Sequence, residues 1–173
     1  MNLDEYQIKA ARTLDPEQSK EDVGRMVMLG LIGETGEVAE LVKKNQFHGR
    51  DINVDDLELE AGDVAWYTAT EFTVSEVSLS AIGKQTFADL DALVADKPLS
   101  DSDCIFGMYA GLMEADGAAS ANRLCMLARL LQNHGSSLER AAVRNIAKLE
   151  ARYPNGFVRS QGNTATTTPD GNE

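Results

Sequence analysis

Residues 30–42 have the sequence GLIGETGEVAELV, in which apolar side chains recur with the three- to four-residue period of an α-helix. Two glutamates, Glu34 and Glu37, lie inside this apolar pattern. Their spacing of three residues puts both carboxylates on one face of the helix, with Cβ atoms about 5–6 Å apart. If a second helix carried a matching pair and packed against this face, four carboxylates would meet.

The matching pair lies in EAGDVAWYTA (residues 60–69), where Glu60 and Asp63 have the same spacing. Four carboxylates cannot stay ionised in apolar surroundings without a cation, because burial and mutual repulsion both favour the protonated form. Oxygen ligands with no His or Cys among them suit Mg²⁺, with Mn²⁺ as the alternative. We therefore predict a metal site made of Glu34, Glu37, Glu60 and Asp63, and with it phosphate chemistry.

Glycines accompany both acidic pairs. Gly30, Gly33 and Gly36 recur every three residues, and Gly62 lies beside Asp63. Each glycine inside a helix costs about 1 kcal/mol relative to alanine. The missing side chains would leave room for a metal and phosphate oxygens, or for the close approach of a neighbouring helix, and the sequence leaves both interpretations open.

Near the end of the chain, Asn145, Lys148 and Arg152 follow one another at spacings of three and four residues, with Tyr153 next. This spacing puts the first three on one face of a helix. A face with two cations opposite a carboxylate–metal cluster would hold the outer phosphates of a nucleotide. The alternative is that these cations pair with surface acids or complement the carboxyl end of their helix.

Two further residues are candidates for substrate binding. Lys44 lies near the end of the helix that carries Glu37, and it allows the same two interpretations as the later cations. Trp66 offers a surface on which a nucleobase would stack, although an aromatic residue at helical spacing is more often part of the core.

Composition narrows the classes of function. The chain has 173 residues and a net charge of −12, which argues against nucleic acid as a partner. It has no apolar run long enough to cross a bilayer, and its first residues are polar and acidic, unlike a signal peptide. Cys104 and Cys125 form no metal-binding spacing and no disulfide framework. We therefore expect a cytoplasmic protein of a bacterium or of a phage-infected bacterial cell.

Strand signals are nearly absent, so the sequence predicts an all-α protein built as an antiparallel helix bundle. Residues 1–159 are expected to form one domain, and residues 160–173, which are rich in Gly, Asn and Thr, a disordered tail. Expected helices cover residues 4–14, 20–47, 56–72, 80–95, 101–115 and 118–134, followed by one that starts at a capping box in residues 136–139 and ends near residue 152.

Taken together, residues 30–44, 60–67 and 145–157 resemble the MazG-like nucleoside triphosphate pyrophosphohydrolases of the all-α NTP pyrophosphatase superfamily. Residues 6–13 resemble the first helix of short, often phage-encoded members. The resemblance implies Mg²⁺-dependent hydrolysis of a nucleoside triphosphate to the monophosphate and pyrophosphate, in a homodimer or homotetramer. It implies the following roles: Glu34, Glu37, Glu60 and Asp63 as Mg²⁺ ligands, and Lys148, with Asn145 and Tyr153 nearby, as groups that hold the triphosphate.

In this mechanism Glu37 or Glu34 would accept the proton of the attacking water. Lys148 and Arg152 would counter the charge of the departing pyrophosphate.

The chain departs from the family pattern in three places. Gly33 stands where many members have an acid, and Ala61 where a leucine is usual. The larger departure is about fifty extra residues within 74–124, which would interrupt the third helix and let it resume over residues 125–135. We expect this helical insert to cap the substrate pocket, to extend a dimer interface, or to have no catalytic role.

Two other classes of protein are compatible with a carboxylate bundle. A di-iron or di-manganese redox protein typically uses Glu-x-x-His pairs, and neither His48 nor His134 follows a glutamate at that spacing. A non-catalytic helical interaction module would retain the fold and the metal site without turnover. The complete set of four acidic residues favours the enzyme over this module.

Overall fold

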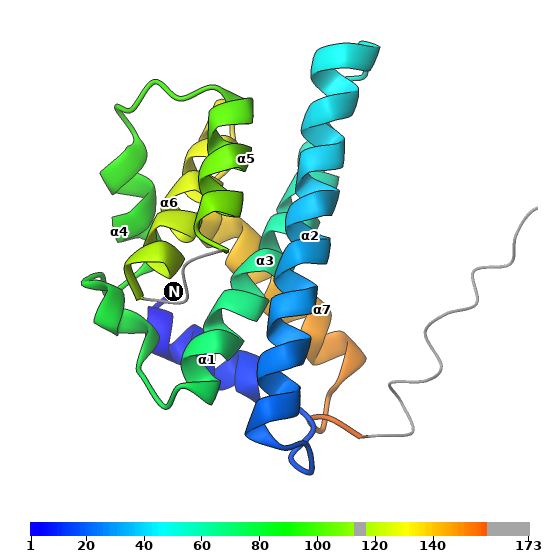
Figure 1. Ribbon diagram of the computed structural model, residues 1–173, viewed down its shortest axis with the longest axis vertical. Coiled ribbons are helices and arrows are strands. Elements are labelled where there is room, and N and C mark those ends of the chain that lie inside the picture. Colours follow the sequence, from blue (N-terminus) through cyan, green and yellow to red (C-terminus); the bar gives the residue numbers. More distant parts are fainter. Residues whose placement is uncertain (113–116, 159–173) are drawn as a thin grey trace, which may run out of the picture.

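The computed structural model describes residues 1–112 and 117–158 (Figure 1). Over these residues the chain forms seven α-helices, one short 3₁₀ helix and no strand, so the all-α prediction is confirmed for this part of the chain. Its elements are, in order, α1 (Leu3–Ala11), α2 (Lys20–His48), α3 (Val54–Val74), η1 (Leu79–Ile82), α4 (Phe87–Val94), α5 (Asp101–Ala110), α6 (Gly117–Asn133) and α7 (Leu138–Arg152).

Helix α2 has the bounds that the apolar period and its end signals predict. Ser19 caps its first turn by accepting a hydrogen bond from the backbone N–H of Asp22. Gly49 ends the helix in the left-handed conformation, with φ of +63°, which glycine adopts without steric cost. The helix is 29 residues long and forms one side of the bundle (Figure 1).

Helix α3 is the centre of the bundle and packs against α1, α2 and α7. Its side chains are buried on more than one face, including Leu57, Ala61, Val64 and Ala69. Because several of these residues are small, neighbouring helices approach α3 closely. The two helices that carry the acidic pairs, α2 and α3, therefore lie side by side, as the site prediction requires.

The prediction of one helix over residues 80–95 is wrong. Helix η1 ends at Ile82 and is capped by Gly83, which has a φ of +82°, and a new helix, α4, begins after Thr86. The Thr86 hydroxyl accepts the backbone N–H of Asp89, and the Asp89 carboxylate accepts the backbone N–H of Thr86. This reciprocal capping box satisfies the N–H groups at the start of α4 and separates the two elements.

Residues 125–135 are not a continuation of α3. Residues 125–133 lie inside α6, a separate helix that begins at Gly117 and ends at Asn133. This helix packs mainly on α5 and α4. Apolar side chains of α4 and α5, such as Phe87 and Met108, are completely buried in the same hydrophobic core as Leu57 of α3. The described part of the insert therefore packs in the hydrophobic core through the apolar side chains of α4 and α5.

Helix α7 ends at Arg152 as predicted, but its cap is Ser137 instead of the expected Ser136. Ser137 accepts the backbone N–H of Arg140, whereas the Ser136 hydroxyl donates to the buried carboxylate of Glu58. The expected helix over 101–115 ends as α5 at Ala110, and the predicted disordered tail lies outside the described residues. Among the helices described, none combines the length and the apolar character needed to cross a membrane.

Candidate metal centre

Three of the four predicted metal ligands converge. Glu34 and Glu37 come from α2 and Glu60 from α3, and their carboxylates present oxygens that all lie within 4.8 Å of one another. Glu34 and Glu60 are half-buried, and Glu37 is exposed at the mouth of the cluster. The i, i+3 spacing in α2 and the packing of α2 on α3 produce this arrangement, so the sequence contained the information needed to find it.

The fourth predicted ligand, Asp63, is bound by helix α7. Both of its carboxylate oxygens accept hydrogen bonds from the ammonium group of Lys148, and one also accepts the amide N–H of Asn145 at 2.9 Å. A cation and a neutral donor therefore compensate Asp63 at the edge of the carboxylate cluster. The residues predicted to hold a substrate and those predicted to hold a metal are thus in direct contact.

The cluster is electrostatically unfavourable when all its members are ionised. Burial raises the pKa of Glu34 to about 7, and the negative charges of Asp63, Glu37 and Glu60 act in the same direction, while Lys148 opposes them. The pKa of Glu60 is also raised, first by burial and then by Glu37 and Asp63. A bound proton or a bound cation relieves this repulsion.

We expect the raised pKa of Glu34 to make the stability of the metal-free protein depend on pH. The ordinary pKa is 4.5, so the folded state holds the proton more tightly, and this contribution to stability is complete below 4.5 and is lost as the pH rises through about 7. In a chelator, the melting temperature should fall between about pH 5 and about pH 8, and fall less in Glu34→Gln. Equal slopes in the two proteins would contradict the assignment.

A buried hydrogen-bond chain holds the Asp63 side of the cluster. The Tyr6 hydroxyl donates to the side-chain oxygen of Asn145 at 3.0 Å, and the Asn145 amide nitrogen donates to Asp63. Tyr6 is completely buried, and burial followed by the charge of Asp63 raises the pKa of its phenol well above the usual value. The sequence did not indicate this role for Tyr6, because its partner lies 139 positions away.

Gly62 allows α7 to approach α3 closely enough for these contacts. A Cβ atom at this position would lie 2.8 Å from the Cβ of Asn145 and 3.1 Å from the carbonyl oxygen of Ala141. Both distances are shorter than ordinary van der Waals contact, and backbone cannot move as easily as a side chain. Of the two interpretations of this glycine, close helix packing is the one that its surroundings support.

Gly62→Ala is therefore expected to lower the free energy of unfolding by about 1–3 kcal/mol, the usual cost of overpacking a core. Urea denaturation followed by circular dichroism measures the change. Gly24→Ala is the matched control, because Gly24 also lies inside a helix and a Cβ there would meet nothing within 4 Å. We expect this control to be stabilised by up to about 1 kcal/mol, and destabilisation of both variants would contradict the packing argument.

Gly30 has a similar function on the other side of the cluster. A Cβ at Gly30 would lie 2.1 Å from Cζ of Tyr67, so the glycine leaves the space in which the Tyr67 ring lies. Burial, followed by the charges of Glu34 and Asp63, raises the pKa of the Tyr67 phenol. In contrast, a Cβ at Gly33 would meet nothing within 4 Å.

The remaining predicted substrate residues have other contacts in this structure. The Trp66 indole donates to the Thr13 hydroxyl at 3.0 Å, which ties α3 to the end of α1, and its ring packs edge-on against Tyr67. Arg152 lies over the ring of Tyr153, with its guanidinium carbon 5.4 Å from the ring centre. Lys44 forms an ion pair with Glu40 at 3.5 Å.

Comparison with known proteins adds one relative. The chain is 35% identical over 100 residues to the gene 37 protein of Mycobacterium phage L5, in an alignment that spans 53% of this chain and 88% of that protein. A scan against protein-family models gives no match. No solved structure matches the chain either.

Proposed function

We propose that the chain, which belongs to the same family as the gene 37 protein of Mycobacterium phage L5, is a Mg²⁺-dependent nucleoside triphosphate pyrophosphohydrolase. The observation that supports this proposal most is the convergence of Glu34, Glu37 and Glu60 beside the Asp63–Lys148 ion pair. The site thus combines three carboxylates, whose mutual repulsion a metal ion would relieve, with the ammonium group of Lys148, which suits a phosphate. On the resemblance of its sequence segments, we assign the helices that carry the site to a bundle of the MazG-like type.

The donor set fits Mg²⁺. The three converging groups are carboxylates, with neither His nor Cys among them, and such hard oxygen ligands are those that Mg²⁺ and Mn²⁺ prefer. Burial, followed by the charges of Asp63, Glu37 and Glu60, raises the pKa of Glu34, and a bound divalent ion would favour its ionised form. When bound, the ion would supply charge neutralisation for the phosphates and acidity for the attacking water.

In the proposed reaction, water attacks the α-phosphorus, the bond between the α-phosphorus and the bridging oxygen breaks, and pyrophosphate leaves with that oxygen. Glu34, whose carboxylate lies in the cluster, is the first candidate to accept the water's proton. Glu37, which is exposed, is the second candidate for this role.

Lys148 would counter the charge of the departing pyrophosphate. Its ammonium group now neutralises Asp63, and a triphosphate entering the cluster would compete with that carboxylate for it. Asn145 would keep Asp63 in place while Lys148 moves to the triphosphate. The Tyr6 hydroxyl fixes the orientation of the Asn145 amide that donates to Asp63. Arg152 and Tyr153, at the end of the same helix, are proposed to contact the substrate farther from the cluster.

A panel of ribo- and deoxyribonucleoside triphosphates, assayed for product identity with Mg²⁺ and with EDTA, tests the proposal. We expect monophosphate and pyrophosphate as products in Mg²⁺ and no turnover in EDTA. Release of inorganic phosphate and nucleoside diphosphate would contradict attack at the α-phosphorus. Equal rates with and without chelator would rule out the metal-dependent function.

A further inference from the structure

The carboxyl end of α2 concentrates positive charge in a chain whose net charge is −12. Residues 43–50 contain three cationic side chains and one histidine, and no acidic residue. A cavity of about 410 Å³ lies at this end of the helix, a size that accommodates a small ligand. Five residues, which we call the basic cluster, line this cavity: Glu40, Lys43, Lys44, His48 and Arg50.

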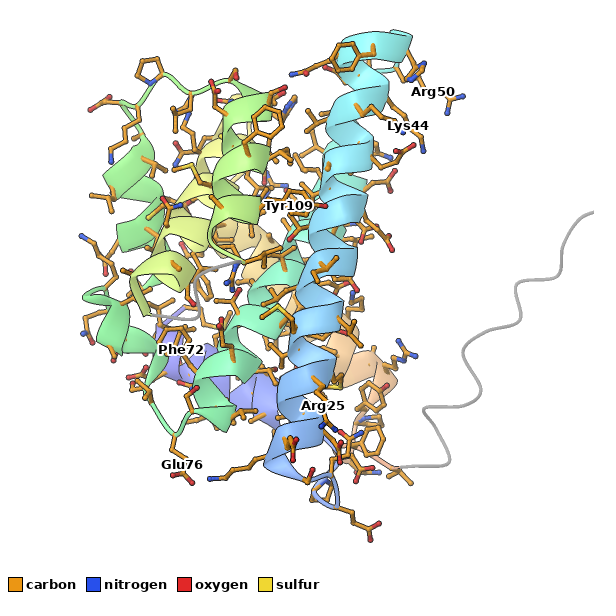
Figure 2. The ribbon with its side chains drawn as sticks, in the orientation of Figure 1. Arg25, Lys44, Arg50, Phe72, Glu76 and Tyr109 are labelled. Atoms are coloured by element: carbon orange, nitrogen blue, oxygen red, sulfur yellow. The ribbon has the colours of Figure 1, made fainter. Side chains whose placement is uncertain are left out.

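A left-handed turn brings Arg50 to the basic cluster. Gly49, with its φ of +63°, turns the chain after α2, and the backbone N–H of Arg50 donates to the carbonyl oxygen of Lys44 at 3.2 Å. The side-chain amide of Asn45 donates to the carbonyl oxygen of Arg50 at 2.9 Å. Figure 2 shows Lys44 and Arg50 together at this end of α2, on the side turned away from α5. Backbone contacts therefore hold Arg50 beside the lysines, although its side chain is exposed.

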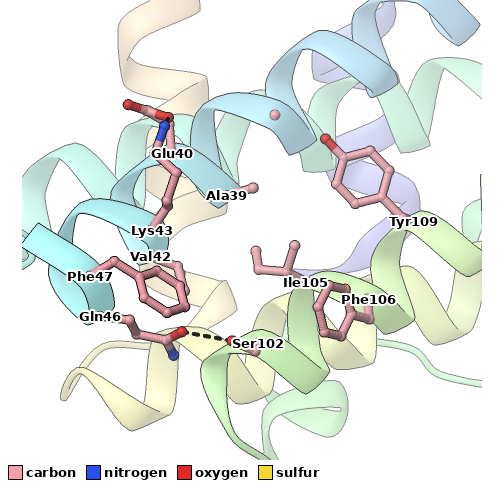
Figure 3. A pocket seen from close by; sticks show the side chains of 11 residues that line it. Ala39, Glu40, Val42, Lys43, Gln46, Phe47, Ser102, Ile105, Phe106 and Tyr109 are labelled. Atoms are coloured by element: carbon pink, nitrogen blue, oxygen red, sulfur yellow. Dashed lines mark hydrogen bonds and ion pairs between the residues drawn. The ribbon is translucent and has the colours of Figure 1, made fainter.

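The positive charge of the basic cluster exceeds what its own carboxylate neutralises. One oxygen of Glu40 forms an ion pair with Lys43 (Figure 3), and the other lies 3.5 Å from the ammonium nitrogen of Lys44. The guanidinium group of Arg50 has no ion pair or hydrogen bond within residues 1–112 and 117–158. Three cations thus share one carboxylate, and the electrostatic potential in the cavity favours an anion.

The two lysines lie away from the carbonyl groups that end α2. Cations in the last turn of a helix commonly stabilise these unpaired carbonyl groups. The ammonium groups of Lys43 and Lys44 instead reach back to Glu40, about one turn toward the amino end of the helix. Stabilisation of the helix end therefore does not account for their position.

We propose that the basic cluster binds the phosphate groups of a di- or triphosphate anion, at a site separate from the metal centre. Lysine ammonium groups attract phosphate as point charges, and the planar guanidinium group of Arg50 donates two parallel hydrogen bonds to such a group. Lys44 follows Glu37 by seven residues, so it lies about 10 Å farther along the same face of α2. Binding there needs no metal ion, and it goes beyond the hydrolysis proposed above.

The extent of the basic cluster favours a small anion over a nucleic acid. The rest of α2, residues 20–42, carries five acidic and two basic residues. A nucleic-acid backbone requires a longer cationic surface, because it presents phosphates at regular intervals along its whole length. The two positive charges that Glu40 leaves without a partner suit the several negative charges that a di- or triphosphate carries at one place.

Isothermal titration calorimetry with inorganic tripolyphosphate, on protein freed of divalent ions, tests the proposal. We expect saturable binding by the wild-type protein and at least about tenfold weaker binding by Arg50→Gln, because the variant loses a charge-assisted donor. Arg25→Gln is the matched control. It removes the same charge from the other end of α2, where Arg25 is paired with Glu21 and Asp22, and it should bind as the wild type does. No binding by the wild type, or equal affinities in the wild type and Arg50→Gln, would overturn the proposal.

Lys148→Gln distinguishes this site from the metal centre. The variant removes the cation that pairs with Asp63, and we expect its affinity for tripolyphosphate to equal that of the wild type. A tenfold loss in Lys148→Gln would place the anion in the metal centre and overturn the proposal. The outcome does not depend on turnover, because no metal ion is present in the titration.

Comparison of probes identifies the source of the phosphate groups. Adenosine triphosphate is titrated under the same conditions as tripolyphosphate, again into the wild type and Arg50→Gln. Equal affinities of the wild type for the two probes would assign the site to inorganic polyphosphate or pyrophosphate, since the nucleoside then adds nothing. Tighter binding of adenosine triphosphate would assign it to nucleotides. Each result supports the site provided that Arg50→Gln weakens the binding, and binding of either probe that is unaffected by this variant counts against it.

Discussion

Glu37→Ala is expected to lower the rate of nucleoside triphosphate hydrolysis at least about a thousandfold while leaving the helix content unchanged. Glu37 contributes one of the three converging carboxylates, so its removal takes away one anionic ligand and weakens the hold of the cluster on a divalent cation. Its side chain is exposed at the mouth of the cluster, so truncation opens no cavity in the core. Pyrophosphate release at saturating Mg²⁺, together with far-ultraviolet circular dichroism, measures both parts of the prediction.

Two variants make this result specific. Glu37→Gln keeps the shape of the side chain and removes its charge, and we expect a loss close to that of Glu37→Ala because the charge holds the cation. Glu5→Gln removes an exposed carboxylate from α1 and should retain wild-type activity. Full activity in Glu37→Gln would show that the cluster is not the catalytic site, and unfolding of Glu37→Ala would assign the cluster a structural role.

The acidic cluster was predictable because its geometry follows from local rules. An i, i+3 pair of carboxylates shares a helix face whatever the rest of the fold does. The apolar residues around Glu34 and Asp63 indicated that these faces are turned toward another helix. The same reasoning predicted the bounds of α2, since the cap at Ser19 and the left-handed Gly49 are recognisable in the sequence.

The spacing of charged residues along the sequence did not predict which side chain each of them contacts. Asp63 carries the acidic-pair pattern as clearly as Glu60, yet it is bound by Lys148, which lies 85 positions away. Tyr6 enters the same network through Asn145, although aromatic residues near the start of a chain indicate nothing about a distant carboxylate. These contacts depend on how α1 and α7 pack across α3, which is a property of the folded molecule.

The segment after α3 shows a different limit of sequence analysis. Its apolar period continues through residues 80–95, but Gly83 and the capping box at Thr86 divide it into two elements. The apolar period alone does not reveal such a break, because both elements turn apolar side chains toward the same core. The sequence also did not predict the role of Arg123, a buried arginine of α6 that links this segment to α3.

Arg123 lies on α6 and is 1% exposed. Its guanidinium group links α6 to α3 and to the end of α5. It donates to the carboxylate of Glu71 at 3.0 Å and to the hydroxyl of Thr68 at 3.2 Å, both on α3. A third hydrogen bond, at 3.1 Å, reaches the carbonyl oxygen of Gly111 at the end of α5. The ion pair therefore joins the described part of the insert to the helix that carries half of the acidic cluster.

Arg123→Ala is expected to lower the free energy of unfolding by about 3–5 kcal/mol, because it leaves Glu71 without its cation and removes the group that fills the space between α3, α5 and α6. Urea denaturation followed by circular dichroism gives the value. Replacing both partners, as Arg123→Met with Glu71→Leu, should cost less than Arg123→Ala, since no unpaired charge remains. Lys20→Ala is the control, because it removes an exposed ion pair with Glu76, and it should leave the free energy of unfolding nearly unchanged. Equal losses in Arg123→Ala and Lys20→Ala would mean that the buried pair does not hold the insert against α3.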